Sequence, residues 1–181
     1  IKLIETDFID DIIRKYIKEN LKYKYEIKYK YKNKLIRLCY YSKKEKLNNI
    51  LIKKILKRII FMMDIVNKYI NINIDIYDTP FKKELPCTNC NKELKKINVN
   101  SGLSYNNNII IYRKEEVLKL LIHEMIHVLD IDVKYENMYD KINLLDKLCL
   151  NDLLINESYV ETWAILLDTY LKIKENMKIS E

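Results

Sequence analysis

Apolar and polar positions repeat with two different periods in the first half of the chain. Side chains that recur every three to four positions are typical of amphipathic helices, and strict alternation is typical of half-buried strands. The pattern predicts helices over Ile1–Asn20 and Leu47–Tyr69, and strands over Tyr23–Tyr31, Leu35–Tyr41 and Ile72–Tyr77, with a hairpin turn at Lys32–Lys34.

The second half begins with a polar loop that Pro80 and Pro86 bracket and that continues through a cysteine pair. Strand and helix patterns then return. The expected elements are a strand–turn–strand unit over Ile97–Tyr112 with its turn at Asn106–Asn108, an apolar helix over Glu115–Leu129, a mixed linker over Tyr135–Leu154 with a short helix near Leu144–Leu148, and a last helix over Glu157–Lys174.

This order of elements predicts an α+β fold, in which a small mixed or antiparallel sheet is packed by helices. A length of 181 residues suits one compact domain with its own core. We divide the chain into an N-terminal α+β region, residues 1–100, and a C-terminal part, residues 101–181, that holds two buried helices. The first region could be a recognition half of the same domain.

Composition changes this picture little. Ile, Lys, Asn and Tyr make up 93 of the 181 residues, a skew that A/T-rich codons explain. The net charge of +7 comes from lysines spread along the chain, which favours a solvated surface over a nucleic-acid site. No apolar run is long enough to span a bilayer, and no secretory signal is recognisable. Because the sequence begins with Ile1 rather than Met, the question of a preceding leader stays open.

Four cysteines are spread over the chain, at Cys39, Cys87, Cys90 and Cys149. Only Cys87 and Cys90 have the spacing of metal ligands, and half of a zinc knuckle is weak support for a site. A disulfide or free thiols in a surface loop are the alternatives. The cysteine count alone does not decide the compartment, and we expect an intracellular protein.

The segment from Leu121 to Leu129 contains the pattern H-E-x-x-H on a predicted helix. His123 and His127 are four residues apart, so they share one helical face and can bind one metal ion. Glu124 is rotated away from them and can reach a metal-bound water. The alternative is two core histidines, but the chain has only two, and this arrangement would arise by chance roughly once in a thousand.

A third ligand must come from another residue type, because no third histidine exists. Asp or Glu is expected, and Cys or Tyr is less suitable. Glu157 and Glu161 lie four apart on the last helix, so one can bind the metal while the other supports the site. Asp130 and Asp132 are alternative candidates for the third metal ligand. Asp130 could instead contact a ligand residue without binding the metal itself. The alternatives for this helix are an exposed acidic face and the glycosylation sequon Asn156–Ser158.

These motifs resemble those of the gluzincins, the thermolysin-like zinc peptidases, over roughly residues 109–164. The resemblance implies a zincin-like catalytic core with an active-site helix and a second, C-terminal ligand helix. It implies His123, His127 and Glu157 as ligands of one Zn²⁺ per chain, Glu124 as the catalytic acid/base, and Glu161 as the carboxylate that orients a ligand histidine. Glu161 replaces the usual Asp, and 30 positions separate His127 from Glu157, more than in thermolysin-like enzymes.

The expected activity is hydrolysis of a protein or peptide by a zinc-activated water, with Glu124 as general base. No histidine remains to stabilise the oxyanion, so the donor candidates are Tyr135, Tyr139, Tyr159 and Arg113. The resemblance also implies an edge strand before the zinc helix that pairs with substrate, formed by Ile109, Ile110, Ile111 and Tyr112. An ordinary core strand is an equal alternative, because three consecutive isoleucines indicate burial on both faces.

Two other functions compete with this one. The net charge and the cysteine pair suggest a DNA-associated zinc protease, but such families use a third histidine. A non-catalytic zinc-binding interaction module would not need Glu124. Because no apolar run is long enough to span a bilayer, we expect no membrane partner. Because the lysines are scattered and a third histidine is absent, we consider nucleic acid a poor candidate for a binding partner.

Overall fold

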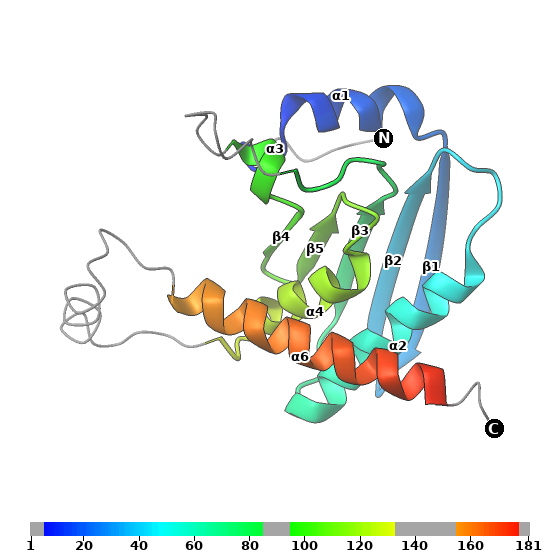
Figure 1. Cartoon of the computed structure of the whole chain (residues 1–181). Helices are drawn as coiled ribbons and strands as arrows, with labels where there is room; N and C mark the ends of the chain where they lie inside the picture. Colours follow the sequence, from blue (N-terminus) through cyan, green and yellow to red (C-terminus); the bar gives the residue numbers. More distant parts are fainter. Residues whose placement is uncertain (1–5, 85–94, 133–154, 178–181) are drawn as a thin grey trace, which may run out of the picture.

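A five-stranded mixed sheet forms the centre of the molecule (Figure 1). The computed structural model describes residues 6–84, 95–132 and 155–177, and in these residues five helices pack on the sheet. The predicted α+β class is confirmed. The strands are β1 (Tyr23–Tyr31), β2 (Lys34–Ser42), β3 (Ile72–Tyr77), β4 (Gly102–Tyr105) and β5 (Asn108–Ile111).

The spatial order of the strands is β1-β2-β3-β5-β4, so β1 and β4 are the two edges. The pairs β1–β2 and β4–β5 are antiparallel hairpins, and β3 runs parallel to both β2 and β5. Both hairpins close through two-residue turns that need left-handed backbone, at Lys32 (φ 43°) and Asn33 (φ 62°) and at Asn106 (φ 50°). Asn serves at two of these positions because it tolerates this conformation better than most residues.

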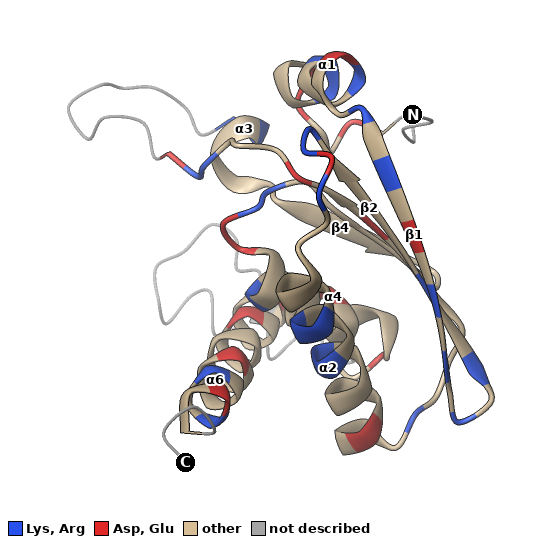
Figure 2. Cartoon of the chain, turned by 90° about the vertical axis from the view of Figure 1, so that its right-hand side faces the viewer, with Lys and Arg blue, Asp and Glu red and all other residues tan. Residues whose placement is uncertain are grey.

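The larger helices lie on one face of the sheet and cover the main core (Figures 1 and 2). Alternate residues of β2, β3 and β5 point into this core, as the period of a strand requires. The helices are α1 (Asp11–Asn20), α2 (Asn49–Val66), α3 (Lys96–Val99), α4 (Val117–Val128) and α6 (Ile155–Met177). Of these, α2, α4 and α6 contribute to the main core, whereas α1 packs with a smaller cluster on the opposite face that includes Cys39, Tyr77 and Ile110.

A buried ion-pair cluster joins α2 to α6. The Arg58 side chain is completely buried, and its guanidinium contacts Asp168 at 3.0 Å and Glu175 at 2.8 Å. Lys54 and Lys172 add outer contacts to Glu175 and Asp168, respectively. This cluster holds the C-terminal half of α6 against α2.

The observed helix ends differ from the predicted ones for local reasons. The first helix begins at Asp11, because the Asp10 side chain accepts a hydrogen bond from the Ile12 N–H and caps it. The second ends at Val66, where Asn67 takes a left-handed conformation (φ 54°).

The predicted strand over the start of Ile97–Tyr112 is wrong there, because Lys96–Val99 forms α3. The short helix predicted near Leu144–Leu148 lies outside the described residues.

Lys and Arg are spread over α1, β1, α2 and α6 (Figure 2). None of the helices in residues 6–84, 95–132 and 155–177 combines the length and apolarity needed to cross a membrane.

Candidate metal centre

The helix α4 places His123 and His127 one turn apart on the same side. Most of α4 is apolar and buried between the sheet, α2 and α6, so its rotation is fixed by packing. The two imidazole rings lie with their centroids 5.1 Å apart, and their Nε2 atoms are 3.4 Å apart. The sequence spacing therefore produces the predicted face-sharing pair.

The helix α6 crosses α4 and brings Glu157 to this pair. Its two carboxylate oxygens lie 3.3 Å from the His123 Nε2 and 3.6 Å from the His127 Nε2. All three potential ligand atoms lie within 4.8 Å of one another. A zinc ion bonded at about 2.0–2.1 Å in tetrahedral geometry holds its donor atoms about 3.3–3.4 Å apart. The cluster thus has the spacing that a zinc ion requires.

Each imidazole is held at its other nitrogen by a second carboxylate. The Nδ1 of His123 lies 3.1 Å from Glu161, and the Nδ1 of His127 lies 3.2 Å from Asp132. A carboxylate can only accept, so these contacts fit neutral imidazoles that carry the proton on Nδ1, and in this tautomer each Nε2 presents a lone pair. Two lone pairs and the Glu157 carboxylate then face one point. Three converging acceptors repel one another unless a cation lies between them, and nitrogen and oxygen donors suit zinc.

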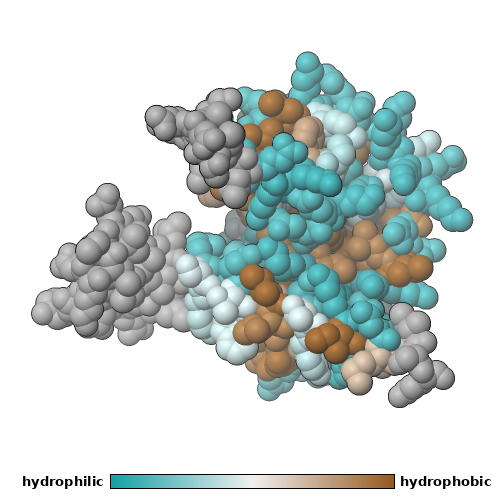
Figure 3. Space-filling view, in the orientation of Figure 1, coloured by the Kyte–Doolittle hydropathy of each residue, from teal (hydrophilic) through white to brown (hydrophobic). Residues whose placement is uncertain are grey.

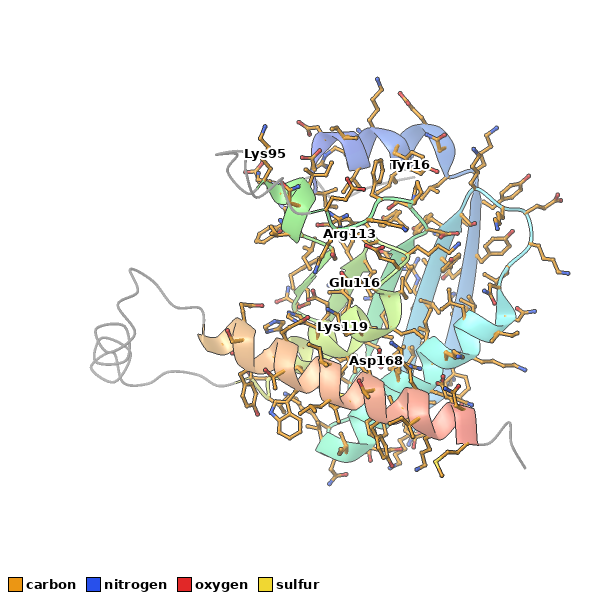
Figure 4. The ribbon with its side chains drawn as sticks, viewed as in Figure 1. Tyr16, Lys95, Arg113, Glu116, Lys119 and Asp168 are labelled. Atoms are coloured by element: carbon orange, nitrogen blue, oxygen red, sulfur yellow. The ribbon has the colours of Figure 1, made fainter. Side chains whose placement is uncertain are left out.

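The outer carboxylates are themselves fixed by neighbouring side chains. Asp132 accepts a hydrogen bond from the Asn156 amide at 3.1 Å. Glu161 lies 2.5 Å from the Lys119 ammonium. That ammonium also contacts Glu116 at 3.3 Å, and Figure 4 labels both of these side chains. Burial tends to raise the pKa of Glu161, but the hydrogen bonds and charges of Lys119 and His123 together outweigh burial and hold that pKa below its usual range. Glu161 is therefore a charged outer partner of His123.

Glu124 lies next to the histidines with its side chain almost completely buried, at 5% exposure. Burial raises the pKa of Glu124, while a hydrogen bond from Ser104 and the nearby His123 act in the opposite direction. A carboxyl in such surroundings is suited to exchange protons with a reacting group.

The histidines and glutamates open into a cavity of about 1010 Å³. Its opposite wall is the edge strand β4 together with the residues before it. The lining residues are Thr6, Phe8, Lys83, Val99, Asn100, Ser101, Gly102, Leu103, Ser104, Tyr105, Leu120, His123, Glu124, His127, Glu157 and Glu161.

The chain's single glycine, Gly102, lies where β4 meets α4. A Cβ atom at this position would lie 2.7 Å from the Ile110 carbonyl oxygen and 3.0 Å from the Leu120 side chain. The missing side chain therefore allows β4 to approach α4 closely beside the metal centre.

The predicted substrate strand is wrong in its position. Ile109, Ile110, Ile111 and Tyr112 are all buried, and β5 pairs with β3 on one side and β4 on the other. Both edges of β5 are therefore occupied, and among residues 6–84, 95–132 and 155–177 the edge strand at the cavity is β4. The alternative of an ordinary core strand is confirmed.

Two oxyanion-donor candidates lie away from the cavity. Arg113 is completely buried, and its three guanidinium nitrogens donate to the carbonyl oxygens of Asn100, Lys82 and Ile97. Tyr159 packs against the main core, with its ring 6.3 Å from that of Trp163. Neither side chain is among the residues that line the cavity. Tyr135, Tyr139, Cys87, Cys90 and Cys149 lie outside the described residues.

The carboxylate that contacts His127 is Asp132 rather than Asp130. Asp130 follows the end of α4 in a left-handed conformation (φ 59°), and this reversal turns the chain so that Asp132 reaches back to the helix. Sequence reasoning considered Asp132 only as a ligand, and it missed Ser104 and Lys119. Neither of these has a recognisable motif, because their roles depend on contacts between distant segments.

Comparison of the chain with models of protein families, with curated proteins and with solved structures found no match. The geometry of the metal centre therefore carries the functional argument by itself.

Proposed function

We propose that this chain is a zinc-dependent metallopeptidase of the gluzincin type, with a zincin-like catalytic core. The observation that supports this most is the convergence of His123, His127 and Glu157 on one point, with the buried carboxyl of Glu124 beside it. A purely structural zinc site has four protein ligands and does not need such a carboxyl. The three-ligand set leaves a position for water.

Each residue of the proposed site has a separate role. His123, His127 and Glu157 would hold the ion, which when bound supplies Lewis-acid activation of water and of the scissile carbonyl. Glu124 accepts the proton of the attacking water as the new carbon–oxygen bond forms. It then delivers that proton to the amine as the carbon–nitrogen bond breaks. Glu161 and Asp132 keep both imidazoles in the required tautomer.

The free edge of β4 supplies a place for an extended peptide. In an antiparallel pair, alternate residues bond to the partner strand and the others point their N–H and C=O groups outwards. The bond from the Tyr112 N–H to the Ser101 carbonyl fixes this alternation. Gly102 and Ser104 therefore point their backbone groups away from β5, towards a substrate that would add a strand to the sheet.

Substitution of Glu124 by Gln tests this function directly. The amide keeps the size of the side chain but cannot take a proton, so we expect unchanged zinc content and a 10²- to 10⁴-fold loss of cleavage. Zinc is measured by atomic emission after dialysis, and cleavage by sequencing the new termini formed in a peptide library. Glu19→Gln, on the exposed face of α1, is the matched control.

Cleavage that persists in Glu124→Gln would refute the role of Glu124. Zinc bound by a wild-type chain that cleaves no peptide of the library would contradict the peptidase proposal and leave a non-catalytic zinc module.

A further inference from the structure

The outer face of α6 carries five large apolar side chains that are 43% to 65% exposed. They follow one another at intervals of three, four, three and four residues, which is the heptad spacing of helices that pack together. We call this set the α6 stripe, and it consists of Trp163, Leu166, Tyr170, Ile173 and Met177.

The stripe is separate from the face by which α6 packs on the protein. Val160, Ala164 and Asp168 are buried against the rest of the molecule and occupy the other side of the helix. Apolar residues of α6 reach the surface, and Figure 3 shows brown patches over this helix. The surface continues onto α2, because the Phe61 ring lies 6.1 Å from the ring of Tyr170.

The stripe is large enough to bind a partner. A large side chain that is half exposed leaves about 100 Å² in water, so the five together offer roughly 500 Å² of mostly apolar surface. Two such surfaces in contact would bury roughly 1,000 Å², which is the lower limit for a specific protein interface. An interface of this size fits a reversible dimer.

The charges around the stripe favour a second copy of this chain. On one side of the stripe the Lys174 ammonium lies 3.2 Å from the Tyr170 hydroxyl. On the other side the stripe is bordered at every seventh position by Thr162, Thr169 and Asn176, all exposed and uncharged. Identical helices can therefore meet along this border without repulsion between like charges. Trp, Tyr and Met are also enriched in protein interfaces.

A membrane surface is a poorer partner for α6. Interfacial helices carry mainly Lys and Arg on their polar face. The only basic residues of α6 are Lys172 and Lys174, and three of its four acidic residues, Glu161, Asp168 and Glu175, contact the rest of the protein.

We propose that the α6 stripe is the interface of a symmetric homodimer in which α6 of one copy packs against α6 of the other. The proposal does not depend on the peptidase function, because none of the five stripe residues belongs to the metal centre. The most common closed assembly of identical chains is a two-fold dimer, in which each surface meets its own copy.

Sedimentation equilibrium of the full chain between roughly 1 and 200 µM tests this proposal, with an expected Kd in the micromolar range. Leu166→Asp and Ile173→Asp each place a charge in the stripe, and we expect each to weaken the dimer by more than about 100-fold. Ile165→Asp is the matched control, because Ile165 is also on α6 and 49% exposed but lies off the stripe. Circular dichroism checks that every variant is folded.

A wild-type chain that stays monomeric over this range would overturn the proposal. So would a dimer that persists in Leu166→Asp and Ile173→Asp, or one that is lost equally in Ile165→Asp. A monomeric wild type that instead binds anionic vesicles would assign the stripe to a lipid surface.

Discussion

At the scale of single residues, the proposed metal centre depends on which nitrogen of each imidazole is available. Glu161 and Asp132 occupy the Nδ1 atoms and leave the Nε2 atoms directed at Glu157. The spacing of His123 and His127 could be predicted from sequence, because it is a property of one helix. The choice between Glu157 and Glu161 could not be made from spacing, because it depends on how α6 is rotated against α4.

We predict that Glu161→Gln and Asp132→Asn each weaken zinc binding by about 10- to 100-fold without removing the site. The amide keeps the hydrogen bond to Nδ1 but lacks the negative charge that makes the imidazole a stronger ligand. Competition with a chromogenic chelator measures the affinity, and Glu19→Gln serves again as control. Affinities equal to that of the wild type would show that these carboxylates do not support the ligands.

At the scale of elements, the helices and most strands follow from the hydrophobic pattern, but the order of the strands does not. Three consecutive isoleucines indicate a strand buried on both faces, and β5 has this property. Whether such a strand also has a free edge depends on which segment pairs beside it. The last hairpin folds back, so that β4 takes the edge and β5 becomes internal.

The contact between α2 and α6 gives a prediction at this scale. Arg58→Met removes the buried guanidinium and leaves Asp168 without its inner partner, so we expect the free energy of unfolding to fall by about 3–5 kcal/mol. Urea denaturation followed by circular dichroism measures this change.

The double variant Arg58→Met with Asp168→Leu tests the coupling, because it removes both buried charges. It should lose less stability than the sum of the two single variants. Strictly additive losses would mean that the two charges do not stabilise each other.

At the scale of the whole molecule, the two regions that the sequence suggested share one sheet. Residues 1–100 supply β1, β2 and β3, and the C-terminal part supplies β4 and β5. The parallel pairing of β3 with β5 joins them, and α4 packs on β4 and β5 of the C-terminal part and on α2 of the N-terminal region. Pairing between strands that are far apart in sequence leaves no local sequence pattern. The sequence therefore could not predict that residues 1–100 and 101–181 share one sheet.

The position of the bound metal tests the central claim most directly. Anomalous diffraction at the zinc edge, from crystals grown with zinc, should show one strong peak between the Nε2 atoms of His123 and His127 and the carboxylate of Glu157. A peak that instead lies beside Glu161, or zinc found only at Cys87 and Cys90, would contradict the account.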